Sequence, residues 1–131
     1  MLKPQKRSID KLIRYAQKLW AVEEWKVVWR YNDSEAGAEI EVTFTEKEAL
    51  ITLDSRYIEE LWSGERKEAW KRLTRDLVHE VGHITLYPLY RAVSDWADHR
   101  ISKEERIVFE EMYNSNENII LDHTICKVFH L

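Results

Sequence analysis

The sequence predicts an α+β domain in which a small sheet is followed by long helices. Its first half contains short runs that alternate apolar and polar residues, the pattern of strands with one face exposed to solvent. Its second half spaces apolar residues three and four apart, which is typical of amphipathic helices. The 131 residues include only three glycines and two prolines and show no internal repeat, so we expect one domain over residues 1–131.

The amino-terminal part is expected to hold one helix and three strands. Ser8 can cap the first helix, because apolar residues follow it at helical spacing up to Trp20. Residues 25–32, 38–45 and 49–54 then alternate apolar and polar side chains, which is the period of a strand. Because the polar faces are regular, we expect a three-stranded, mainly antiparallel sheet with one side exposed to water.

The carboxy-terminal part is expected to be helical. A short helix over 56–62 would end at Ser63 and Gly64, and a longer helix would run over 65–87 until Pro88 stops it. The longer helix would bury the apolar residues that recur at its period, which are Trp70, Leu73, Leu77, Val81 and Ile84.

A second long helix is expected near the end of the chain, after an irregular or briefly helical segment at 87–100. Ser102 and Glu105 have the spacing of a capping box, which marks a helix start. The helix would run nearly to the last residue, with 119–121 as a buried segment. The sequence YNSNEN at 113–118 has poor intrinsic helix propensity.

The sequence HEVGH, at residues 79–83, has the pattern of a metal site on a helix. A helix turns about 100° per residue, so His79 and His83 project from one face and can share one Zn²⁺ ion. Glu80 lies beside the first histidine and can accept a proton from a water that the metal activates. Gly82 weakens the helix, which suggests that another part of the chain packs closely against it.

A catalytic zinc ion needs a third protein ligand and a position left for water. The sequence lacks the HExxHxxGxxH extension of the metzincins, because Leu86 and Leu89 stand where that pattern has Gly and His. Glu117 is the first candidate, since a downstream helix that crosses behind the histidine helix can bring its carboxylate under the metal. The alternatives in the same region are Glu110, Glu111, Asp95, Asp98 and His99.

Two segments carry a resemblance to a known family. LVHEVGHITLYPL at 77–89 and YNSNENIILDHTI at 113–125 resemble the small HExxH zinc metallopeptidase-like proteins of the gluzincin type, which are common in phage and prophage genomes. The resemblance covers about residues 51–128. It implies a minimal zincin fold, with the last strand, near Leu50 to Leu53, at the edge of the substrate cleft.

The resemblance also implies roles for individual residues. His79 and His83 would be the metal ligands, Glu80 the general base and Glu117 the third ligand, because the sequence Asn-Glu at 116–117 matches the family's glutamate helix. This helix often carries an Asp four residues after its Glu. Here Leu121 occupies that position and Asp122 follows it, which is a departure from the family pattern.

These residues lead us to expect a zinc-dependent metallopeptidase that hydrolyses peptide bonds in a peptide or protein substrate. The oxyanion of the reaction would be stabilised by a hydroxyl or cationic group, with candidates Tyr87, Tyr90, Arg91, His99, Tyr113 and His123. The alternatives are a catalytically inactive zincin-like module with a binding or regulatory role, and a structural protein without metal.

Composition narrows the possible partners and the compartment. The net charge is -4, and the basic cluster at 66–75 is mixed with acidic residues, so we expect a solvated helix face and no nucleic-acid partner. No apolar run is long enough for a membrane span or a signal peptide. The single cysteine, Cys126, excludes an intramolecular disulfide and a Cys-rich zinc ribbon, so we expect a cytoplasmic protein.

Overall fold

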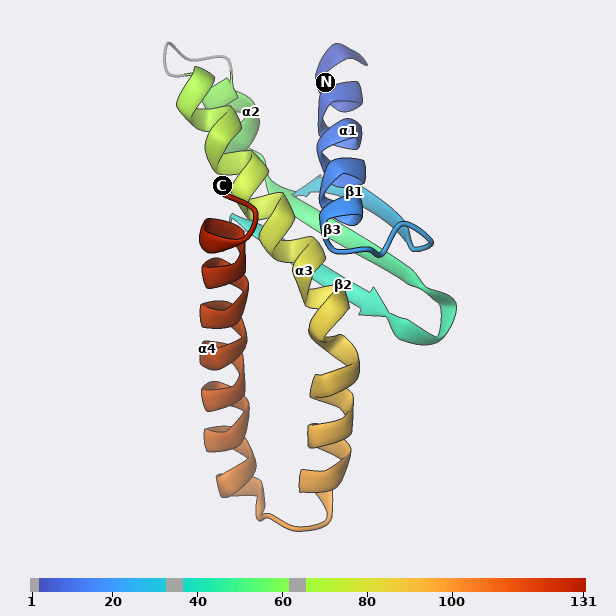
Figure 1. Ribbon diagram of the computed structural model, residues 1–131, viewed down its shortest axis with the longest axis vertical. Helices are drawn as coiled ribbons and strands as arrows, with labels where there is room; N and C mark the ends of the chain where they lie inside the picture. Colours follow the sequence, from blue (N-terminus) through green and yellow to red (C-terminus); the bar gives the residue numbers. More distant parts are fainter. Residues whose placement is uncertain (1–2, 33–36, 62–65) are drawn as a thin grey trace.

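The computed structural model describes residues 3–32, 37–61 and 66–131, and it confirms the α+β fold class. Helix α1 (Lys3–Leu19) precedes strands β1 (Lys26–Asn32), β2 (Ala38–Thr43) and β3 (Glu48–Asp54), with a 3-10 turn η1 (Phe44–Glu46) between the last two. Helices α2 (Arg56–Leu61), α3 (Arg66–Asp98) and α4 (Lys103–Lys127) follow. Figure 1 shows α3 between α4 and the sheet.

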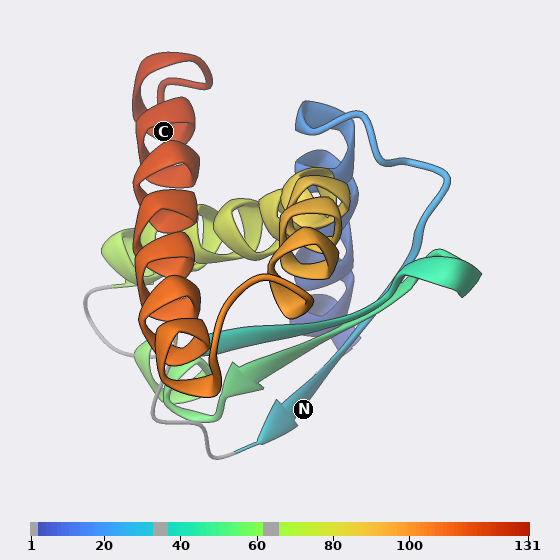
Figure 2. The same cartoon turned by 90° about the horizontal axis from the view of Figure 1, so that it is seen from below.

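The sheet is mixed, and the prediction of a mainly antiparallel sheet is wrong for one of its two strand pairs. The strand order is β1-β3-β2, with β1 parallel to β3 and β2 antiparallel to β3. The alternation of residues fixes which side chains share a face, and it does not fix the direction of the neighbouring strand. β3 is therefore central and does not edge the cleft as expected. β2 is the edge strand nearest to α3 and α4 (Figure 2).

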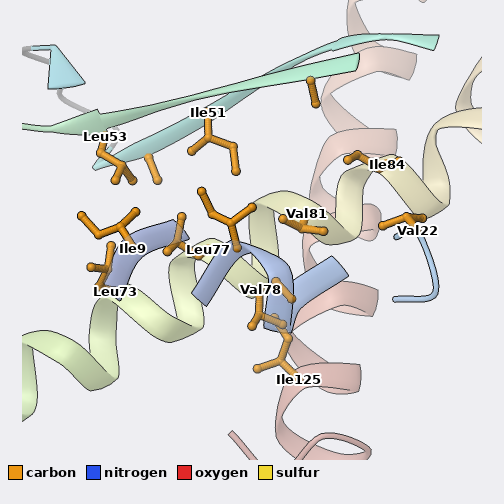
Figure 3. Packing of buried hydrophobic residues seen from close by; sticks show 14 of the residues in the cluster. Ile9, Val22, Ile51, Leu53, Leu73, Leu77, Val78, Val81, Ile84 and Ile125 are labelled. Carbon is orange, nitrogen blue, oxygen red and sulfur yellow. The ribbon is translucent and has the colours of Figure 1, made fainter. Parts of the chain in front are cut away.

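The core lies between one face of the sheet and the helices that cover it (Figure 3). Ile9 of α1, Ile51 of β3 and Leu77 of α3 are fully buried. Each such side chain contributes about 1.5–3 kcal/mol through its removal from water. Of the five residues expected on the buried face of α3, Trp70 is half-buried and Leu73, Leu77, Val81 and Ile84 are buried. This packing holds α3 in place on the sheet.

Two helix boundaries differ from the sequence predictions. α1 begins at Lys3, ahead of Ser8, so Ser8 is not its cap. α3 continues through Pro88 to Asp98, so the irregular segment predicted at 87–100 is largely helical. Figure 1 shows α3 changing direction part-way along, after which its last turns run beside α4. The predicted helix break at Ser63 and Gly64 lies outside the described residues.

Packing against α4 explains why α3 continues past its proline. Ser94 and Ala97 are buried in the second part of α3. The Arg106 guanidinium of α4 donates a hydrogen bond to the Ser94 carbonyl at 3.3 Å and one to the Ser94 hydroxyl. These contacts offset the backbone hydrogen bond that Pro88 cannot donate.

α4 begins as the sequence predicts but turns a different face inward. The Ser102 hydroxyl accepts a hydrogen bond from the Glu105 amide at 3.2 Å, which completes the predicted capping box. Within the predicted buried segment, only Leu121 is buried, whereas Ile119 and Ile120 are 65% and 50% exposed. α4 therefore packs through a narrow face that is centred on Leu121.

None of the described helices is long and apolar enough to cross a membrane.

Candidate metal centre

His79, Glu80 and His83 converge on one side of α3. The ring centroids of the two histidines lie 5.0 Å apart, one helical turn from each other. One ligand atom from each histidine and one carboxylate oxygen of Glu80 all lie within 4.8 Å of one another. The three side chains are half-buried, so they face a cleft and are not enclosed in the core. Two imidazoles beside a carboxylate are donors suited to zinc and to other divalent metals.

α4 contacts both histidines through polar side chains. The His83 Nδ1 atom lies 2.6 Å from the Glu117 Oε1 atom, and Glu117 is itself buried. The His79 Nδ1 atom lies 2.9 Å from the Asp122 Oδ1 atom, and its Nε2 atom lies 3.1 Å from the Asn118 Oδ1 atom. The structure therefore brings Glu117 to the predicted site, and it adds two contacts to His79 that the sequence analysis did not assign.

Gly82 allows α4 to come this close. A Cβ atom on Gly82 would lie 2.6 Å from Leu121 Cδ2 and 2.8 Å from Trp20 Cζ2, which is closer than real contacts allow. The Trp20 indole is fixed in turn, because its Nε1 atom donates a hydrogen bond to the Val78 carbonyl at 2.8 Å. The close packing expected at Gly82 is thus confirmed. Leu121 occupies the centre of the contact, and the polar residues that flank it reach the histidines.

The other candidates for a third ligand lie away from the histidines, toward the far end of the α3–α4 hairpin. Glu110 accepts hydrogen bonds from the Tyr90 hydroxyl and from Arg106 Nε, each at 3.0 Å. Asp98 pairs with the same Arg106 guanidinium. The remaining candidates are exposed there, and they are Glu111, Asp95 and His99. Glu117 is thus the candidate that the fold places beside a histidine of the motif.

The histidines open into a cleft of about 610 Å³ between β2, α3 and α4, which we call the histidine cleft. From α3 it is lined by Glu80 and by four residues about one helical turn apart, namely His79, His83, Tyr87 and Tyr90. β2 contributes Ala38, Glu39, Ile40 and Val42, and α4 contributes Asn114, Glu117 and Asn118. An edge strand therefore borders the cleft, so that an extended chain lying in it could pair with β2.

The environment of Glu80 shifts its titration toward neutral pH. Burial raises the pKa of Glu80 to about 7, against the effect of His83, whose positive charge favours the ionised carboxylate. The negative charges of Asp76 and Glu39 act in the same direction as burial. A carboxyl group with a pKa near 7 can both accept and return a proton at neutral pH.

Glu117 influences the titration of two neighbouring groups. Burial alone would lower the pKa of His83, but the hydrogen bond to Glu117 and the charges of Glu80, Glu117 and Asp122 outweigh it, and the pKa is raised. Burial, the charge of Glu117 and a hydrogen bond to Glu117 together raise the pKa of Tyr113 to about 12. The Tyr113 phenol therefore stays protonated at neutral pH and can act as a hydrogen-bond donor to Glu117.

Neither a protein-family model, nor a curated protein, nor a solved structure matches this chain.

Proposed function

We propose that this protein is a zinc-dependent peptidase in which His79, His83 and Glu117 hold the metal and Glu80 is the general base. The main support is the convergence of the two histidines and Glu80 within 4.8 Å, in a cleft that an edge strand borders. Substrates in this proposal are peptides or proteins that enter the cleft in an extended form.

The donor set and its hydrogen bonds fit a metal of this class. Two imidazoles and one carboxylate are the protein ligands of many catalytic zinc sites. Asp122 contacts Nδ1 of His79 at 2.9 Å, and such a contact fixes the ring so that its Nε2 atom is available to a metal once Asn118 moves aside. A zinc ion held there would lower the pKa of a water molecule and polarise a peptide carbonyl group.

The proton transfers in the proposal belong to Glu80. Its carboxylate would accept a proton from the attacking water and then donate it to the leaving amine. Of the candidates for stabilising the oxyanion, Tyr87 and Tyr90 line the histidine cleft, and a phenol hydroxyl there can donate a hydrogen bond to the developing charge. β2 would hold the substrate backbone, since it is an edge strand whose residues line the cleft.

One observation favours a second candidate function, a metal-binding module without catalysis. The group of ligand atoms that converge within 4.8 Å contains Glu80 and does not contain Glu117. If Glu80 itself bound the metal, its carboxylate would no longer be free to act as the base. The protein would then keep the cleft and the ion but would not hydrolyse a bound peptide.

The substitution Glu80→Gln separates the two functions. Zinc content is measured by elemental analysis, and cleavage of a complex peptide mixture is followed by mass spectrometry, with the exposed Glu111→Gln as control. A peptidase keeps its zinc in Glu80→Gln and loses at least about 100-fold in cleavage. Loss of zinc in that variant would favour the binding module. Full cleavage by Glu80→Gln would refute the proposed mechanism.

A further inference from the structure

The histidine cleft continues along β2 into a second pocket of about 540 Å³, which we call the Phe44 pocket. The two cavities share Val42 and Tyr87 in their linings. The other residues that line the Phe44 pocket are Thr43, Phe44, Thr45, Pro88 and Arg91. Because the linings are shared, a chain that lies in the histidine cleft beside β2 can place a side chain in the Phe44 pocket.

Aromatic rings form a continuous row beside both cavities. Phe44 stacks on Tyr87, with centroids 5.5 Å apart and ring planes 25° apart. Tyr87 contacts Tyr90 at 6.1 Å, and Tyr90 contacts Tyr113 at 5.2 Å. The row therefore leads from η1 across α3 to α4. Phe44, which also contacts the buried Trp25 ring at 5.8 Å, is 43% exposed, and a large exposed ring in a concave surface is typical of a binding site for apolar groups.

The lining of the Phe44 pocket favours an uncharged occupant. Arg91 is the charged residue of the lining, and its guanidinium lies 3.8 Å from the Asp95 carboxylate. The rest of the lining is aromatic, aliphatic or hydroxyl-bearing. By contrast, the histidine cleft is lined by the carboxylates of Glu39, Glu80 and Glu117. The two cavities thus differ in chemistry, and the Phe44 pocket is the one suited to an apolar side chain.

We infer that the Phe44 pocket binds a large apolar or aromatic side chain of the substrate peptide, an inference that rests on the proposed peptidase function. The chain from β2 (Ala38–Thr43) to Phe44, the first residue of η1, sets the distance from this side chain to the scissile bond. Ile40 and Val42 border the histidine cleft, and Phe44 follows them by four and two residues. An extended peptide beside β2 rises by about the same 3.3 Å per residue as the strand, so the apolar residue lies about two to four residues from the bond that is cut.

Binding to a peptide array tests the subsite without requiring catalysis. Zinc-loaded Glu80→Gln protein is applied to immobilised random dodecapeptides, and the same protein with Phe44→Ala or with Val28→Ala is compared. Val28 is a matched control, because it is an apolar residue of β1 that is 46% exposed and lines neither cavity. We expect bound peptides to be enriched in large apolar residues. Phe44→Ala should weaken their binding by about three- to tenfold, and Val28→Ala should leave it unchanged.

Cleavage-site mapping with wild-type protein tests the distance. Cuts in a complex peptide mixture should show large apolar residues enriched about two to four positions to one side of the cleaved bond. Cleavage with no such enrichment would overturn the inference and leave the peptidase function standing. Absence of cleavage, together with an apolar preference that Phe44→Ala removes from the array, would support the subsite and count against the peptidase. Arrays without apolar preference, or with equal effects of Phe44→Ala and Val28→Ala, would overturn the inference.

Discussion

Gly82→Ala is the substitution that tests most directly how α3, α4 and Trp20 pack at the site. An alanine in a helix is favoured over glycine by about 1 kcal/mol, so at an open position the substitution would stabilise the protein. At Gly82 the new methyl group would meet Leu121 at 2.6 Å and two Trp20 ring atoms at 2.8 and 2.9 Å. Inserting a methyl group into a packed core typically costs about 1–3 kcal/mol.

The cost at Gly82 should be at the upper end of that range, because its neighbours have little room to move. The hydrogen bond from Trp20 to the Val78 carbonyl and the edge-on contact with Phe129, at 4.9 Å between centroids, hold the indole in place. The gain of about 1 kcal/mol in helix propensity offsets part of this cost. We therefore expect Gly82→Ala to lower the free energy of unfolding by a net amount of about 1–2 kcal/mol, which is a fall in Tm of about 3–8 °C.

Urea and thermal unfolding followed by circular dichroism measure the effect of Gly82→Ala. Ser115→Ala is the control, since Ser115 is exposed on α4 and alanine there should stabilise by a few tenths of a kcal/mol. In the background of Trp20→Phe, which has a smaller ring, Gly82→Ala should cost about 1 kcal/mol less. A higher Tm for Gly82→Ala than for wild type would refute the packing argument.

Three further substitutions test separate parts of the account. Burial raises the pKa of Glu80 to about 7 in the folded protein, so the stabilisation that its protonated form provides is lost as pH rises from about 4.5 to 7. Zinc-free Glu80→Gln should therefore exceed wild type in unfolding free energy by about 1–3 kcal/mol at pH 8 and match it near pH 4.5, and equal stability at pH 8 would contradict this. Ser102→Ala removes the α4 cap and should cost about 1 kcal/mol in urea unfolding, whereas no change would show that the capping box contributes little. The Tyr31 hydroxyl is buried and has no hydrogen-bond partner among the described residues, so Tyr31→Phe should leave stability unchanged or raise it by up to about 1 kcal/mol, and a marked loss in Tm would reveal a partner.

Much of the site follows from local sequence, because helical spacing is a local property. The spacing of His79 and His83 alone places both rings on one face, and a glycine inside a helix, at Gly82, indicates a close contact without naming its partner. Glu117 could be predicted because the apolar run at 119–121 indicates that this stretch of a downstream helix packs inward, and Leu121 does so. Asp122 was harder to assign, since its position depends on Leu121 pointing at Gly82, and only the packed pair of helices fixes that orientation.

The parts that failed depend on long-range packing. Pro88 indicated a helix end, but contacts between Ser94 and Arg106 allow α3 to continue. The alternation of apolar and polar residues in the strands does not reveal that β3 lies between β1 and β2. Because of this strand order, the strand that borders the cleft is β2 and not β3. Ile119 and Ile120 are apolar, yet the described part of the chain leaves them exposed, because α4 contacts α3 through its Leu121 face.

The measurement that tests the central claim most directly is zinc content per chain, by elemental analysis after reconstitution with zinc and removal of the excess. Wild type, His79→Ala and Glu117→Ala are compared with the control His123→Ala, whose side chain is exposed on α4. The account predicts about one zinc ion per chain in wild type and in the control, loss in His79→Ala and loss or strong weakening in Glu117→Ala. Wild-type protein that folds but binds no zinc would contradict the proposed metal centre and the peptidase function with it.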